Sequence, residues 1–140
     1  MKFATLGAMV ILSAFVACGG SGSSAKAVNN PAAPKWGQAS YTLNTATQTT
    51  LNATLTVVAG TAPLPSSVTV TIAVAEVAPP ANLVTPPPIQ ATSANSYQIT
   101  VPISVSKDSS GNYPTGSYQV EADITVNGYL ASGTMTLVVQ

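Results

Sequence analysis

The sequence predicts one all-β domain, a two-sheet antiparallel sandwich, and three observations support this fold class. There are 18 Thr and 15 Ser residues together with 11 Pro and 10 Gly, which is the usage of short strands joined by tight turns. After residue 18, no apolar stretch has the 3.6-residue period of a helix. Apolar residues instead alternate with polar ones over several segments, as expected for strands with one buried face.

Charge is the property in which this chain departs most from a typical soluble domain. Charged residues make up 6% of the 140 residues, against about 25% in an average domain, and there is no His. Nucleic-acid binding requires a basic surface that neutralises phosphates, so we exclude nucleic acid as a partner. General acid–base catalysis and metal sites draw on the same scarce residues. The composition therefore argues against an enzyme and predicts no cofactor and no bound metal.

Residues 1–17 have the organisation of a signal peptide. Lys2 precedes an apolar run from Phe3 to Val16, which ends in small residues. A transmembrane helix needs about 20 apolar residues, more than this run provides, and no basic stop signal follows it. We therefore expect residues 1–17 to be removed during export.

The sequence Phe15-Val16-Ala17-Cys18, followed by Gly19, resembles the lipobox of bacterial lipoproteins. The resemblance implies that Cys18 becomes the lipid-modified first residue of the mature chain, and that Gly19 permits transfer to an outer membrane. Cys18 is the only cysteine, so it cannot form an intramolecular disulfide, and acylation would consume its exposed thiol. The alternative is an ordinary secretory signal cut after Ala25-Lys26-Ala27, which would discard Cys18 and give a secreted or periplasmic protein.

Residues 18–35 are expected to form a flexible tether between the lipid and the domain. They consist largely of Gly, Ser, Ala, Asn and Pro, and we expect no packed element in them. A flexible chain of this length spans roughly 20 to 25 Å, which holds a domain just clear of the lipid headgroups. The sandwich domain is then predicted to cover residues 36–140.

Alternation with a period of two residues marks the strands of this domain. We predict strands at residues 40–43, 51–57, 68–74, 97–105, 118–126 and 129–139. Pro102 cannot donate a ladder hydrogen bond, so the strand that contains it is expected to lie at a sheet edge or to be bulged there.

The last two predicted strands form a hairpin. Asn127-Gly128 favours a two-residue type I′ turn, which places Val126 opposite Tyr129. In this register, two small residues of the return strand, Ala131 and Gly133, lie on the inner face. We expect a bulky side chain from the other sheet, Tyr97 or Trp36, to fill the space that they leave.

The segment Tyr113–Val120, YPTGSYQV, is similar to the corner before the sixth strand of immunoglobulin-like and fibronectin type III-like domains of bacterial surface proteins. The resemblance implies an immunoglobulin-like sandwich of about seven strands, in which the hydroxyl of Tyr118 binds an upstream backbone group. It also implies that loops 44–48 and 107–115, and the segment after the strand at 68–74, gather at the membrane-distal end. Such a fold implies no activity by itself.

Residues 78–90 contain five prolines and favour an extended, polyproline II course. In one interpretation, Leu83 and Val84 offer apolar surface to an aromatic groove of a partner. In the interpretation that we favour, the segment is a rigid crossover whose prolines also prevent edge-to-edge aggregation.

Aromatic and acidic residues supply the remaining candidate sites. Trp36, Tyr41 and Tyr113 lie outside the alternating inner positions and are candidates for a carbohydrate-binding platform, although Trp36 is interpreted more simply as core. Residues 108–112 place oxygen ligands at alternate positions but lack the carboxylates of a calcium loop, so we predict a wide turn. Glu121 and Asp123 lie two residues apart on one strand face, which we interpret as solvated surface.

The sequence therefore predicts a non-enzymatic, lipid-anchored envelope protein, a structural or protein-binding module that acts through membrane-distal loops. Its expected partners are the membrane, through the lipid on Cys18, and an envelope protein or polysaccharide. The alternative is a carbohydrate-binding domain that uses surface aromatic residues.

Overall fold

A computed structural model describes residues 32–140. Cys18, the expected signal peptide and most of the expected tether lie outside the described residues. Within them, the chain forms nine strands and one short 3-10 helix, η1 (Ser93–Asn95). The strands are β1 (Ala33–Trp36), β2 (Ser40–Leu43), β3 (Thr50–Val58), β4 (Ser67–Val74), β5 (Leu83–Val84), β6 (Ile89–Thr92), β7 (Gln98–Val105), β8 (Gly116–Val126) and β9 (Tyr129–Val139).

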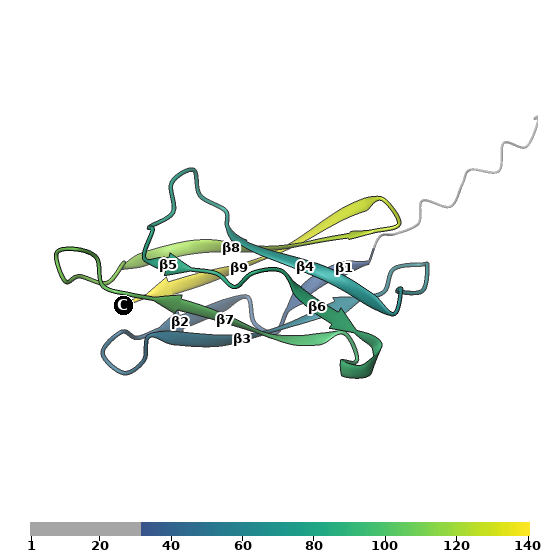
Figure 1. The fold of residues 1–140 in the computed structure, drawn as a ribbon, viewed down its shortest axis with the longest axis horizontal. Coiled ribbons are helices and arrows are strands. Elements are labelled where there is room, and N and C mark those ends of the chain that lie inside the picture. The colour runs from purple at the N-terminus through teal and green to yellow at the C-terminus, as the bar shows by residue number, and fades with distance from the viewer. Residues whose placement is uncertain (1–31) are drawn as a thin grey trace, which may run out of the picture.

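The strands form two sheets that enclose one apolar core (Figure 1). One sheet has the order β1-β3-β7-β5 and the other has the order β2-β9-β8-β4-β6. All neighbouring strands are antiparallel except β2, which runs parallel to β9. The predicted all-β sandwich is confirmed at this level. The described chain has nine strands, where about seven were predicted, because β1, β5 and β6 form in segments expected to be irregular.

The inner faces are those that the alternation predicts. Val68, Val70 and Ile72 of β4 are buried, and Leu55 and Val57 of β3 face them from the other sheet. Burying one such side chain contributes about 1.5 to 3 kcal/mol. No polar or charged residue of the described chain is fully buried. The core is therefore held by apolar packing, and polar groups remain at the surface.

The β8–β9 hairpin has the predicted turn and register. Asn127 and Gly128 have φ angles of 52° and 80°, the left-handed pair that a type I′ turn requires. Val126 pairs with Tyr129. Tyr129 shares the parity of the inner face but is 53% exposed, because the hairpin extends past the end of the core.

Pro102 lies on β7 opposite Asn52 of β3. The backbone N–H of Val105 donates to Thr49 O on the β3 side. Backbone nitrogens of successive residues point to opposite sides of a strand, so the nitrogen of Pro102, three residues earlier, points away from β3. On that side, β5 pairs only with Ser104 and Val105. The predicted edge position is wrong for β7 as a whole, which lies between β3 and β5, but Pro102 lies on a part of β7 with which β5 does not pair.

The domain begins earlier than predicted. Residues 33–35 were expected to belong to the tether, but they pair with β3, and Ala32 and Pro34 are buried. The composition of residues 33–35 did not predict this strand, because the strand forms through backbone pairing with β3, which is distant in the sequence. β1 is an edge strand of its sheet, where a proline is tolerated.

The proline-rich segment crosses between the sheets, as favoured, but it does so through two short strands. The chain leaves β4, adds β5 to the edge of the four-stranded sheet, and returns as β6 beside β4. The three consecutive prolines of this segment lie between β5 and β6. The segment is thus tied to both sheet edges on the same side of the sandwich.

Candidate functional site

Two loops at one end of the sandwich enclose the candidate site. Loops 44–48 and 107–115 lie at the end opposite to the one where the described chain begins (Figure 1). Between them is a groove of about 510 Å³, which we call the distal groove. It is lined by Thr45, Ala46, Lys107, Gly111, Asn112, Tyr113 and Thr115. The predicted gathering of these two loops is confirmed.

Asn44 holds the first loop in a compact turn. Its Oδ1 accepts from the N–H of Ala46 at 3.0 Å, and its carbonyl oxygen accepts from the N–H groups of Thr47 and Gln48, each at 3.0 Å. The N–H of Thr45 donates to Gln140 O at 2.7 Å, so the loop is also bound to the end of the chain. These bonds fix the wall of the groove that the first loop supplies.

Asp108 organises the second loop. Its Oδ1 accepts from the N–H groups of Ser110 and Asn112 at 2.8 and 2.9 Å, and its own N–H donates to Asn112 O. Gly111 has a φ of 82°, which closes the turn. The predicted wide turn is confirmed. Among residues 32–140, no group of three or more His, Cys, Asp or Glu residues could hold a metal ion.

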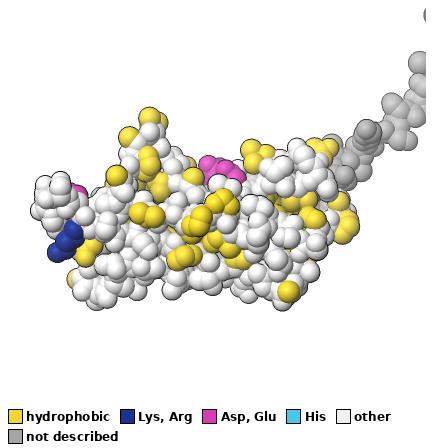
Figure 2. All heavy atoms as spheres, viewed as in Figure 1, with side chains coloured by type: hydrophobic (Ala, Val, Ile, Leu, Met, Phe, Trp, Pro, Cys, Tyr) yellow, Lys and Arg dark blue, Asp and Glu magenta, His cyan; other side chains and the backbone are white. Residues whose placement is uncertain are grey.

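Tyr113 and Lys107 give the groove its chemistry. Tyr113 is half-buried against the core, and Lys107 Nζ lies 5.5 Å from the centroid of its ring, within cation–π range. In the space-filling view, a dark-blue patch of basic side chain lies at this end of the molecule, on the left (Figure 2). The groove therefore combines one cation, one aromatic ring, an amide and hydroxyl groups.

The corner that leads from this loop into β8 is built on Tyr118. Tyr118 is buried, and its hydroxyl donates to Thr115 O at 3.1 Å, which is the predicted bond to an upstream backbone group. Burial raises the pKa of Tyr118 above its usual value, and the negative charge of Glu76 raises it further. The corner thus fixes the base of the second loop.

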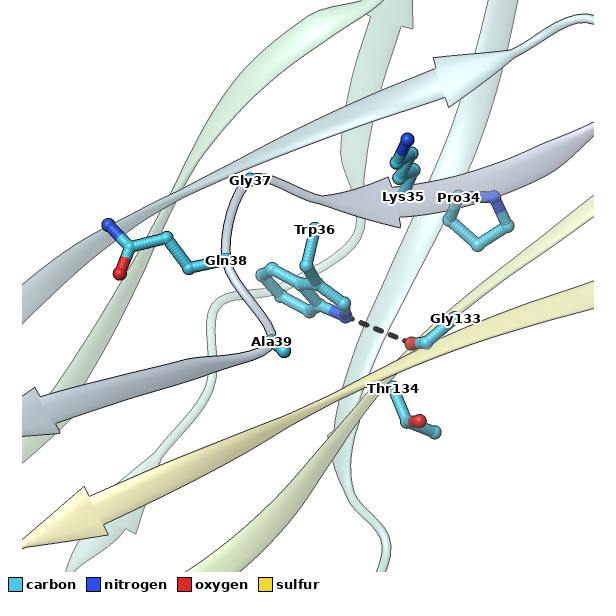
Figure 3. A pocket seen from close by; sticks show the side chains of 8 residues that line it. All are labelled: Pro34, Lys35, Trp36, Gly37, Gln38, Ala39, Gly133 and Thr134. Atoms are coloured by element: carbon cyan, nitrogen blue, oxygen red, sulfur yellow. Dashed lines mark hydrogen bonds between the residues drawn. The ribbon is translucent and has the colours of Figure 1, made fainter.

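Trp36 is part of the core and cannot serve as a carbohydrate platform. It is only 6% exposed, and its Nε1–H donates to Gly133 O at 2.9 Å (Figure 3). A pocket of about 420 Å³ at this position is lined by residues 34–36 of β1, residues 37–39 of the crossing to β2, and residues 133–134 of β9. The space over Gly133 was expected to hold the side chain of Tyr97 or Trp36, but Pro34 of β1 occupies it, and Trp36 binds the Gly133 carbonyl beside it.

Other predicted residues are dispersed over the molecule. Leu83 is buried, whereas Val84 is 53% exposed, so they do not form a joint apolar surface. Tyr41 is half-buried, and its hydroxyl accepts from Thr54 N at 3.3 Å. Leu83 and Tyr41 are therefore engaged in packing or hydrogen bonding, and only Val84 remains exposed.

The acidic pair on β8 lies on the outer face of the five-stranded sheet. Both side chains are half-exposed, and Asp123 accepts a hydrogen bond from the Ser132 hydroxyl. A pocket of about 350 Å³ there is lined by Asp123 together with Ser and Thr residues, but Glu121 is not part of it. The pair therefore does not share one cleft.

Sequence reasoning missed four exposed apolar side chains. Val58 is 46% exposed at the end of β3, Val77 protrudes fully from the loop after β4, and Tyr129 and Leu130 are 53% and 67% exposed. Val77 follows no alternating pattern, so no sequence signal marks it. Tyr129 and Leu130 directly follow the turn at Asn127-Gly128, and this position at the end of a hairpin was the signal that could have revealed them.

The chain matches no protein-family model, and a search of curated proteins finds no significant match. Within residues 32–140, the structure contains no helix of the length and apolarity needed to span a bilayer. The function is therefore argued from the surface of the domain.

Proposed function

We propose that the protein is a non-enzymatic, lipid-anchored envelope protein whose domain binds an envelope protein through the distal groove. The observation that carries the proposal is the position of this groove, at the end of the sandwich opposite to Ala32. If the lipid on Cys18 holds the chain at the other end, the groove faces away from the membrane. The surface beside it, built from two hydrogen-bonded loops, is preformed for binding.

We further propose that the domain is immunoglobulin-like. In such a fold, strands A, B, E and D form one sheet and strands C, F and G form the other, with a tyrosine at the start of strand F that binds an upstream backbone group. The sheet order β1-β3-β7-β5, with β8 between β9 and β4 in the other sheet, supports this assignment, as does the bond from the hydroxyl of Tyr118 to Thr115 O. This chain differs from a simple seven-strand arrangement between β4 and β7, where it forms β5 at the edge of one sheet and then β6 at the edge of the other.

Lipid attachment is tested by metabolic labelling. Cells that express the full chain are supplied with a labelled fatty acid, in parallel with cells that express Cys18→Ser. We expect label on the wild-type chain and none on the variant. An unlabelled wild type, or label that survives in Cys18→Ser, contradicts the anchor and favours an ordinary secretory signal.

Binding through the distal groove is tested by a blocking substitution. Ala46 is exposed and lines the groove, so Ala46→Arg introduces a long charged side chain without disturbing the core. Thr71→Arg on the exposed outer face of β4 is the matched control. We expect the wild type and Thr71→Arg to retain the same envelope partner and Ala46→Arg to lose it. Equal retention by all three chains contradicts the proposal.

A carbohydrate-binding role is the second candidate, and Tyr113 is the observation that favours it. Its ring lies in the groove beside amide and hydroxyl groups, which is a composition suited to a sugar. Glycan-array binding that is abolished by Tyr113→Ala but unaffected by Trp36→Phe would support this function. Binding that is unaffected by Tyr113→Ala would exclude the groove as a sugar site.

A further inference from the structure

The β8–β9 hairpin ends in an exposed apolar tip. Tyr129 and Leu130 are 53% and 67% exposed, although both are large hydrophobic residues. Their exposure follows from the loss of pairing at this end of the sheet. On one side, the pairing of β4 with β8 ends at Ile124, although β4 itself begins at Ser67, and on the other side, β2 pairs with β9 only from Thr136 onward. Residues 126–130, which we call the hairpin tip, are therefore paired with neither neighbouring strand.

The hairpin tip lies at the same end of the sandwich as the beginning of the described chain (Figure 1). Apolar side chains are visible along this end in the space-filling view (Figure 2). Thirteen residues, 19–31, separate Cys18 from Ala32. Thirteen residues extend over at most about 45 Å, so a lipid on Cys18 would hold this end of the domain, and not the other, near the headgroups.

The chemistry of the hairpin tip suits a lipid surface. The tip contains no charged residue, and the nearest acid along β8, Asp123, is hydrogen-bonded to Ser132. Tyrosine combines an apolar ring with a polar hydroxyl and is enriched where membranes meet water. Lys35 is exposed on β1, the first strand of the described chain. Its positive charge complements anionic headgroups.

We propose that the hairpin tip is a membrane-contacting surface, which inserts Tyr129 and Leu130 into the headgroup region of the bilayer. The proposal rests on the proposed lipid anchor at Cys18. A tethered domain meets the bilayer at high effective concentration, so two side chains add a useful second contact to the lipid. This contact orients the long axis of the domain and points the distal groove away from the membrane.

The test places a fluorescent reporter at the tip of the full, lipidated chain. Leu130→Cys introduces a thiol that can be labelled, because acylation blocks Cys18. Ala46→Cys, on the exposed loop at the other end, is the matched control, and both positions lie outside the core. The purified proteins are reconstituted into vesicles of phosphatidylethanolamine and phosphatidylglycerol, and quenching by aqueous iodide is measured after flotation.

We expect iodide to quench the reporter at position 130 several-fold less than the reporter at position 46. Equal quenching in protein that floats with the vesicles overturns the hairpin proposal and leaves the anchor intact. Protection that increases with protein density on the vesicles also overturns it, because the tip then contacts a second copy of the chain. Protein that fails to float overturns the anchor, and the membrane-contacting tip with it.

Discussion

At Gly133, the backbone of β9 lies directly against the backbone of β1. A Cβ atom at this position would lie 2.2 Å from Pro34 O, and the indole of Trp36 donates to the carbonyl of Gly133 itself. The small residue was expected from the sequence to face something bulky, and Trp36 was one of two candidates. Pro34 occupies the space instead of either side chain, because β1 runs directly over β9, and β1 could not be predicted from its own composition.

Gly133→Ala should therefore destabilise the domain by about 3 kcal/mol, because backbone on both strands must move to accept one methyl group. Urea unfolding of the full chain measures this difference. Gly111→Ala is the control: it meets no neighbour within 4 Å but has a φ of +82°, so we expect only about 1 kcal/mol from backbone strain. Equal losses at the two positions would contradict the close approach of β1 and β9.

Tyr118 makes stability depend on alkaline pH. Burial, followed by the charge of Glu76, raises its pKa above the ordinary value of 10.0, so the unfolded chain loses this proton at lower pH than the folded chain. The corresponding stability is fully present below pH 10 and is lost as pH rises through the folded pKa. Tyr118→Phe should lose about 1 kcal/mol at neutral pH, the value of the bond to Thr115 O.

The measurement is chemical unfolding of wild type and Tyr118→Phe from neutral pH to above pH 10. The gap between the two chains should narrow at the alkaline end, since only the wild type carries this titrating group. A gap that stays constant over the whole range would show that Tyr118 does not contribute to the pH dependence.

At the scale of elements, the long strands and β2 could be predicted, whereas β1, β5 and β6 could not. In β4, β7, β8 and β9, alternation continues over at least eight residues, and the buried face and the hairpin register follow from it. β5 has two residues and β6 has four, and both lie in or beside the proline-rich segment. They become strands because the edges of β7 and β4 offer them hydrogen bonds.

Pro102 lies on the part of β7 that has no partner strand on one side, and we expect it to prevent other chains from pairing there. Pro102→Thr restores a backbone N–H that faces the uncovered edge, and it introduces a residue that favours strands. We expect the variant to remain folded but to self-associate more strongly than the wild type. Sedimentation of both chains at matched concentrations detects the change. A variant that sediments like the wild type would show that the proline does not protect this edge.

At the scale of the whole molecule, the low charge content leaves a surface kept wet mainly by hydroxyl and amide groups. On the outer face of the five-stranded sheet, such groups bind one another across strands, as Gln119 does with Thr136 and Gln90 with Ser67 and Thr69. The distal groove differs from this face, because it places a lysine and an aromatic ring together.

The distal groove could be predicted only in outline. The order of the strands places loops 44–48 and 107–115 at one end, so the sequence was sufficient to bring the loops together. The pairing of Lys107 with Tyr113 depends on how Asp108 folds the second loop, and the removal of Trp36 and Leu83 from the candidate surface depends on tertiary packing. Periodicity contains neither kind of information.

In our proposal, the protein binds its partner through the distal groove while it is anchored at the opposite end. Site-specific photo-cross-linking in intact cells tests this most directly, with the photoreactive residue at Asn112 in the groove and, in a control chain, at Thr71 on the outer face of β4. We expect a discrete envelope adduct from position 112 and none from position 71. The same adducts from both positions, or adducts from position 71 alone, would contradict binding through the groove.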